Sequence, residues 1–174
     1  MTIRIEENTR GIWDSQCRTV FATVHTFKRE PIFRDRRLAG LMVDALRWLS
    51  GTGDCVVHSW VVMPDHVHLL LSLPTGGDGL DNSHLQPERM LDKLKVFPAQ
   101  RISRLVFRTN IWDNDDQIDP IDDEVEFFRH MLYILENPRC AGLVKSCSEY
   151  PYLEVPERCM LQEGLLDVDE ALVP

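Results

Sequence analysis

The sequence has no apolar run that approaches the roughly 20 residues a membrane-spanning helix needs. Its first residues, Met1-Thr2-Ile3-Arg4-Ile5-Glu6-Glu7, lack the charged-then-apolar order of a secretory signal. The 5 cysteines form an odd set without a Cys-x-x-Cys pair, which argues against a disulfide framework and against a zinc knuckle. These absences predict a cytoplasmic protein with free thiols and no membrane partner.

Positive charge is scarce as well, because the formal net charge is −9 over 174 residues. The deficit is uneven, however. Residues 113–126 hold eight acids and no base, whereas residues 85–108 hold six bases and two acids and residues 1–50 hold nine bases and six acids. Attraction to a phosphate backbone depends on local clustering of Lys and Arg, so the sequence remains compatible with a DNA or RNA partner.

The length and the 44% hydrophobic content fit one domain with a substantial core. We expect a polar lead-in over residues 1–17, a single domain over residues 18–153 and an acidic tail over residues 154–174. The sequence shows no internal repeat.

The most informative stretch is residues 56–73, in which two apolar runs flank Met63-Pro64-Asp65. The runs predict strands over 56–62 and 69–73, and the Pro-Asp pair is typical of a tight turn. The second run opens with His66-Val67-His68. Because strand side chains alternate faces, His66 and His68 point to one face and Val67 to the other. Near-continuous apolarity predicts a central place in a sheet.

Two imidazoles on one strand face can hold one divalent ion. The alternative is a pair of half-buried histidines satisfied by backbone carbonyls, and the strand pattern alone leaves both interpretations open. His25, at the end of a predicted first strand over residues 18–25, is either a third ligand or a hydrogen-bonded histidine.

The rest of the chain predicts helices and loops. Asp35 begins a helix that ends near Ser50, and Pro87 begins another that ends near Leu105 and is kinked or split at Pro98. The Gly-rich stretch within residues 74–86 predicts a loop, and residues 107–112 predict a short strand.

A third helix is expected between Asp119 and Pro138, with Asp119 as N-cap, Pro120 in the first position and Pro138 as the stop. At 100° per residue one stripe is apolar and the opposite stripe is polar. Tyr133 lies in the middle of the polar stripe, either as a plain surface ring or as a functional group. The predicted apolar stripe is Val125, Phe128, Leu132 and Leu135; the polar one is Glu126, Arg129, His130, Tyr133, Glu136 and Asn137.

Two motifs together resemble the REP-associated branch of the IS200-like single-tyrosine (Y1) transposases. Residues 62–71, Val-Met-Pro-Asp-His-Val-His-Leu-Leu-Leu, are similar to that family's His-hydrophobe-His core. Residues 133–144, Tyr-Ile-Leu-Glu-Asn-Pro-Arg-Cys-Ala-Gly-Leu-Val, are similar to its downstream tyrosine motif. Residues 29–33, Trp112 and residues 149–152 are further matches, and the resemblance spans roughly residues 18–153.

The resemblance implies an α+β, ferredoxin-like fold with an antiparallel central sheet flanked by helices. It also implies nicking and rejoining of single-stranded DNA, on hairpin-forming repeat sequences, through a 5′-phosphotyrosine. Tyr133 becomes the nucleophile, and His66, His68 and Asn137 become ligands of Mg²⁺ or Mn²⁺. The implied protein is a monomer or a homodimer. Candidate DNA contacts are Arg29, Lys93, Lys95 and Arg101.

Two departures remove positive charge where DNA is expected. The usual basic stretch after Trp112 is here Asp113-Asn114-Asp115-Asp116-Gln117, and a usual basic position is Cys140. Two other functions therefore stay open. One is a transposase-derived nucleic-acid-binding protein that has lost cleavage, and the other is a small enzyme in which His66 and His68 hold zinc.

Overall fold

The computed structural model describes residues 13–75 and 85–156. The chain runs β1 (Cys17–His25), α1 (Arg36–Gly51), β2 (Val56–Val62), β3 (His66–Pro74), α2 (Pro87–Val106), β4 (Gln117–Ile121), α3 (Glu124–Cys140) and β5 (Leu153–Glu154). The first twelve residues of the predicted lead-in, the centre of the predicted loop and the predicted tail from residue 157 lie outside the described residues. In the described part of the chain, no helix has both the length and the apolarity to cross a bilayer.

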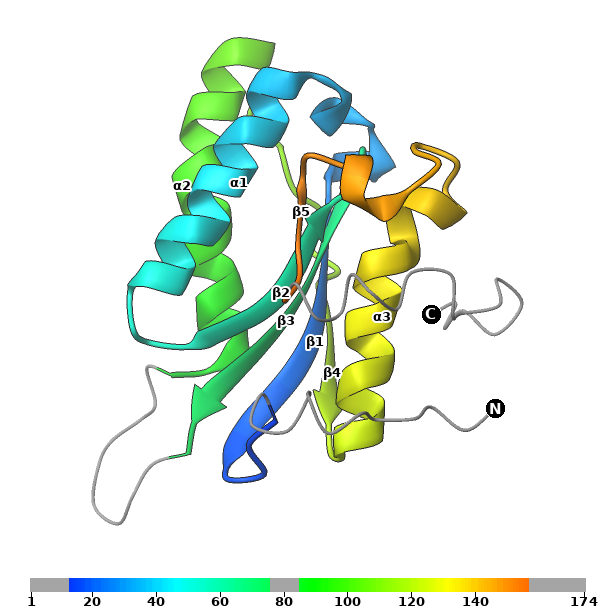
Figure 1. The fold of residues 1–174 in the computed structure, drawn as a ribbon. Coiled ribbons are helices and arrows are strands. Elements are labelled where there is room, and N and C mark those ends of the chain that lie inside the picture. Colours follow the sequence, from blue (N-terminus) through cyan, green and yellow to red (C-terminus); the bar gives the residue numbers. More distant parts are fainter. Residues whose placement is uncertain (1–12, 76–84, 157–174) are drawn as a thin grey trace.

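One five-stranded sheet organises the molecule. Its strand order is β4-β1-β3-β2-β5, and every neighbouring pair is antiparallel. Helices α1 and α2 cover one face of the sheet, and α3 covers the other (Figure 1). The β-α-β-β-α-β chain order with β1 and β3 in the centre is the ferredoxin-like α+β arrangement that was predicted, with β5 added at one edge.

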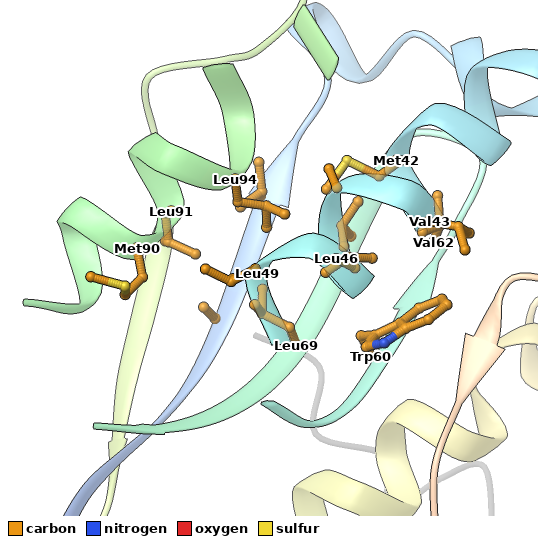
Figure 2. Packing of buried hydrophobic residues seen from close by; sticks show 14 of the residues in the cluster. Met42, Val43, Leu46, Leu49, Trp60, Val62, Leu69, Met90, Leu91 and Leu94 are labelled. Atoms are coloured by element: carbon orange, nitrogen blue, oxygen red, sulfur yellow. The ribbon is translucent and has the colours of Figure 1, made fainter. Parts of the chain in front are cut away.

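The alternation of β3 divides its side chains between two cores. Val67, Leu69, Leu71 and Leu73 belong to the larger core under α1 and α2, whereas Leu70 belongs to the core under α3. Figure 2 shows the larger core, in which leucines and methionines of α1 and α2 pack over β2 and β3. Each fully buried side chain of this kind stabilises the fold by roughly 1.5–3 kcal/mol. The predicted central place of β3 is confirmed.

Helices α1 and α2 begin where the sequence predicts. The Asp35 carboxylate accepts a hydrogen bond from the Arg37 backbone N–H (2.9 Å), as an N-cap should. α2 runs on through Pro98 as one helix and ends at Phe107, whose φ of 53° is left-handed. The predicted strand over residues 107–112 is therefore wrong. Only Trp112 reaches the sheet there, through an isolated bridge to Thr26.

The fourth strand forms instead from the segment predicted to start α3. Asp119 and Pro120 lie in β4 and pair with Phe21 and Val20. An edge strand tolerates a proline, because one of its sides needs no ladder hydrogen bond. The true N-cap of α3 is Asp123, whose carboxylate accepts from the Glu126 N–H at 2.7 Å.

Pro138 does not stop α3, which contradicts the prediction for its end. Pro138 lacks a backbone N–H, but it lies in the last turn of α3, and the helix continues to Cys140. The helix ends in a Schellman motif, in which Gly142 (φ 68°) donates to the Arg139 carbonyl and Leu143 donates to the Pro138 carbonyl. Asn137 is consequently helical.

The predicted faces of α3 are correct only in part. Phe128, Leu132 and Leu135 are buried as expected, but Val125 is 42% exposed. Two residues of the predicted polar stripe, His130 and Glu136, are buried. The reason is that α3 packs on the sheet with one side and against the segment after it, including Cys147, with another. Glu136 is compensated by Arg139, whose Nε lies 2.6 Å from its carboxylate.

Candidate active site

The pairing of β1 with β3 gathers polar side chains on the sheet face under α3. His25 lies opposite His66 and Thr23 lies opposite His68 in the antiparallel register. Directly opposite residues share a face, so these four side chains form one patch. Val67 points into the other core, which confirms the predicted alternation.

The His66 ring is oriented by its neighbour in the turn. Its Nδ1 lies 2.7 Å from Oδ1 of Asp65. The turn itself is fixed, because the Asp65 carbonyl accepts from the Thr26 N–H (2.9 Å) and from the Thr26 hydroxyl (2.8 Å). The sequence marked Asp65 only as a turn residue, but its carboxylate also positions an imidazole.

The His68 ring is buried and held on two sides. Its Nδ1 lies 2.9 Å from the Thr23 hydroxyl, and its ring stacks on Phe21 with centroids 5.2 Å apart. The His66 and His68 rings are themselves 4.5 Å apart, edge to face. Because both Nδ1 atoms are engaged, the Nε2 atoms are left for another partner. Among the described residues, none forms a hydrogen bond with either Nε2.

Burial keeps these imidazoles neutral. It lowers the pKa of His66, although the Asp65 carboxylate opposes this effect. It lowers the pKa of His68 well below the usual value, and the nearby His66, His25 and Arg29 add to that shift. Neutral imidazole is the form that coordinates metal ions, so neither ring must first lose a proton at neutral pH.

Tyr133 of α3 faces the same patch. Its ring lies 5.2 Å from the His68 ring and 5.9 Å from the Phe21 ring, centroid to centroid. The side chain is half-buried, and its hydroxyl has no hydrogen-bond partner in the described part of the chain. Phe21 thus contacts both the phenol and the imidazole, a role that no pattern in the sequence indicates.

The other two tyrosines of the sequence, Tyr150 and Tyr152, are less suited to react. The Tyr150 hydroxyl donates to the Val62 carbonyl (2.8 Å), and burial raises the pKa of Tyr150 to about 12. Tyr152 packs edge to face against Tyr150. Both rings serve to hold the segment after α3 onto the domain.

Asn137 lies one helical turn beyond Tyr133, at i+4 on α3, so the two residues share a face as predicted. Its side chain is partly exposed, and the described residues offer its amide no hydrogen bond.

His25 belongs to the patch although the sequence left its role open. It is 3% exposed, its ring lies 6.0 Å from that of His66, and its Nδ1 has no hydrogen-bond partner within residues 13–75 and 85–156. Asp115 approaches this Nδ1 at 3.9 Å. The acidic segment that departs from the family pattern therefore lies beside the histidines.

The predicted DNA-contacting cations fall into two places. Arg29 is exposed beside the patch, and its positive charge adds to the effect of burial, which lowers the pKa values of His25, His66 and His68. Its φ of 54° is left-handed, which costs of the order of 1 kcal/mol. Lys93, Lys95 and Arg101 lie on α2, on the opposite side of the sheet from α3 (Figure 1). Lys95 is bound to Asp116 at 2.5 Å.

The residues present fit a divalent ion with an open coordination sphere. Each of the two neutral imidazoles has an Nε2 that is free among the described residues, while its Nδ1 is held by a neighbouring side chain, Asp65 for His66 and Thr23 for His68. A hydrogen bond at the other ring nitrogen is the usual arrangement of a metal-ligating histidine. No group of three or more His, Cys, Asp or Glu within the described ranges is arranged to hold a metal ion. Asn137 is of a residue type outside that set, and its role as a third ligand stays a prediction.

Comparison with known proteins agrees with the family resemblance. No family model matches the chain. Over 96 residues the chain is 26% identical to a REP-associated tyrosine transposase of Escherichia coli K12, and the match covers 55% of this chain and 52% of that protein. The chain thus matches about half the length of this curated relative.

The fold superposes on a solved REP-associated tyrosine transposase bound to a REP hairpin. The TM-score is 0.60 at 22% identity, with 88% of this chain and 85% of that chain covered. The chain resembles the REP-associated tyrosine transposases in sequence and in fold. The predicted resemblance is confirmed, and so is the α+β fold class. The REP hairpin is bound by the transposase in the solved structure.

Proposed function

We propose that this protein nicks and rejoins single-stranded DNA through a covalent bond between Tyr133 and a 5′-phosphate, with hairpin-forming sequences as substrate. The observation that carries the proposal is the approach of the Tyr133 ring to within 5.2 Å of the His68 ring. This contact joins residues 65 positions apart in the chain, and it unites the two motifs in one site.

In the proposed reaction the Tyr133 oxygen attacks the phosphorus of a phosphodiester. The bond from phosphorus to the tyrosine oxygen forms while the bond to the 3′ oxygen breaks. The phenol loses its proton and the leaving 3′ oxygen gains one, so the products are a 5′-phosphotyrosine and a free 3′-hydroxyl. The reverse attack by a 3′-hydroxyl reseals the strand, and no nucleotide cofactor is consumed.

His66, His68 and Asn137 are the residues that would hold the ion in this proposal. Mg²⁺ or Mn²⁺, when bound, polarises the scissile phosphate and offsets the charge that develops on its oxygens. Asp65 and Thr23 keep the two imidazoles in the ligating orientation, and Phe21 keeps Tyr133 beside His68. Arg29, beside the same patch, is placed to attract the phosphate backbone.

A second function is supported by the position of Asp115. An exposed carboxylate 3.9 Å from His25 repels a phosphate backbone, and this favours a nucleic-acid-binding protein in which cleavage has been lost.

The test is incubation of the full chain with single-stranded hairpin oligonucleotides and Mn²⁺, followed by denaturing electrophoresis to detect adducts and native electrophoresis to detect retention. The proposal predicts covalent protein–DNA adducts that are absent from Tyr133→Phe and present in the matched control Tyr152→Phe. Retention of the oligonucleotide without adducts supports the second function. A protein that binds no single strand contradicts both.

A further inference from the structure

The outer side of α1 and α2 carries an aromatic pair, in which Trp48 is exposed and Phe97 is half-buried. The Trp48 and Phe97 rings are nearly parallel, at 7°, with centroids 6.1 Å apart. Trp48 is 45% exposed, and the Arg101 guanidinium lies over the Phe97 ring, with Cζ 5.0 Å from its centroid. Phe97 is half-buried and packs against the core under α1 and α2, but core packing does not explain the Trp48 ring, which is open to solvent.

A shallow hollow surrounds the pair. Its volume is about 590 Å³, and Asp92, Lys93, Val96 and Gln100 complete its lining. Ligand sites typically enclose about 300–1,000 Å³. The hollow therefore offers aromatic rings, an amide, two cations and one carboxylate, that of Asp92, in one place.

The charge of this layer indicates what could fill the hollow. α1 and α2 together carry eight Lys or Arg residues and three Asp or Glu residues, but four of these cations are paired with acids that lie outside the two helices. The pairs are Arg37 with Asp35, Arg47 with Glu154, Lys93 with Asp54 and Lys95 with Asp116. Lys93 is paired with Asp54 at 2.7 Å, but Arg101 has no ion-pair partner in the described part of the chain. The second half of α2, residues 96–106, carries Arg101 and Arg104 and no acid, and this local positive charge beside the rings favours a polyanion.

A second copy of this chain is a poorer occupant. A two-fold interface would place this basic surface against itself, and juxtaposed like charges oppose association. Stacked rings flanked by arginine instead match the way single-stranded nucleic acids bind, with bases on aromatic faces and phosphates near cations.

We propose that Trp48, Phe97 and Arg101 form a stacking surface for the bases of a single-stranded nucleic acid. This surface belongs to α1 and α2, which lie on the opposite side of the sheet from α3, the helix that carries Tyr133 (Figure 1), so it is a second contact and not part of the reacting site. The inference rests on the proposed function only for the identity of the strand as DNA.

The test is binding of an oligothymidylate of about 20 nucleotides at low salt, followed by fluorescence anisotropy. Trp48→Ala should weaken binding about tenfold, which is the usual loss for one stacked base. Trp48→Phe, which keeps a ring, should bind nearly as the natural protein does. Arg101→Ala should weaken binding and reduce its salt dependence. Lys145→Ala removes an exposed cation from the loop after α3 and is the charge-matched control, with no change expected.

Each outcome decides for or against the stacking surface. Equal binding by Trp48→Ala and the natural protein overturns it, as does a natural protein that binds no single strand. A dimer in sedimentation that Trp48→Ala converts to a monomer also overturns it, since the face would then join two copies. Adduct formation at Tyr133 is scored separately. Binding that depends on Trp48, without adducts, supports the stacking surface and contradicts the proposed function. Adducts together with binding that does not depend on Trp48 support the proposed function and contradict the stacking surface.

Discussion

Asp65 and His66 are adjacent in the chain, and the Asp65 carboxylate lies 2.7 Å from Nδ1 of the imidazole that follows it. A carboxylate there accepts from Nδ1–H and leaves the Nε2 lone pair facing outward. This is how a protein fixes both the tautomer and the orientation of a metal-ligating histidine.

Replacing Asp65 by alanine should therefore weaken Mn²⁺ binding about 10–100-fold without unfolding the protein. Asp65→Asn is the matched control, because its amide oxygen can still accept from Nδ1–H, and it should retain most of the affinity. Isothermal titration calorimetry measures both variants. An unchanged affinity in Asp65→Ala would show that His66 is not a ligand, or that its orientation is set by other contacts.

Removing a charge from the acidic segment should strengthen binding of single-stranded DNA. Asp115 lies beside His25 with its side chain 68% exposed, so its charge is free to act on an approaching phosphate. Asp115→Asn should strengthen single-stranded DNA binding modestly, by about twofold at low salt, and the gain should vanish as salt screens the charge. Asp122→Asn, which neutralises another exposed acid, is the control. Weaker binding by Asp115→Asn would mean that this carboxylate assists the site.

His58 supplies a pH prediction. Its Nε2 lies 2.7 Å from the Ser72 hydroxyl, and burial lowers its pKa to about 4. Below pH 6.5, which is the pKa of this imidazole in the unfolded chain, His58 takes up a proton when the chain is unfolded but stays neutral when it is folded. The contribution of His58 to the free energy of unfolding is therefore fully present above pH 6.5. It falls progressively toward pH 4, by up to about 3 kcal/mol.

Urea unfolding at about pH 7 and about pH 5 checks this. The natural protein should lose more stability between the two pH values than His58→Gln, which cannot titrate. The lowered pKa values of His25, His66 and His68 act in the same direction and remain in both proteins. Equal losses in the two proteins would contradict the assignment to His58.

Gly142, just after α3, and Gly40, inside α1, should respond in opposite ways to replacement by alanine, and this tests the account of how α3 ends. Gly142 has a φ of 68° in the Schellman motif, so Gly142→Ala should destabilise the fold by about 1 kcal/mol. Gly40 lies inside α1 with open space where a Cβ would lie, and Gly40→Ala should stabilise by about 0.5–1 kcal/mol. Chemical unfolding measures both, and shifts of the same sign would contradict this account of the helix end.

The sequence predicted the parts of this site that depend on local geometry. His66 and His68 share a face because a strand has a period of two, and Tyr133 and Asn137 share one because a helix has 3.6 residues per turn. The turn at Pro64-Asp65 and the start of α1 at Asp35 were likewise readable from single residues.

The parts that depend on long-range pairing were not readable. Phe21, Thr23 and His25 join the site only through the register of β1 with β3, which brings together residues more than 40 positions apart. Asp119-Pro120 has the local chemistry of a helix start, yet pairing with β1 makes it a strand. The faces of α3 were misjudged because His130 packs on Phe21 of the sheet, and because the segment around Cys147 covers a second side of that helix.

The central claim is that Tyr133 is the residue that bonds to DNA beside His66 and His68. The most direct measurement is mass spectrometry of the proteolysed adduct formed with a hairpin oligonucleotide and Mn²⁺. The account predicts a 5′-phosphonucleotide on the peptide that contains Tyr133, and no adduct in His68→Ala. A nucleotide on Tyr150 or Tyr152 instead, or an adduct at Tyr133 that forms equally well without both histidines, would contradict it.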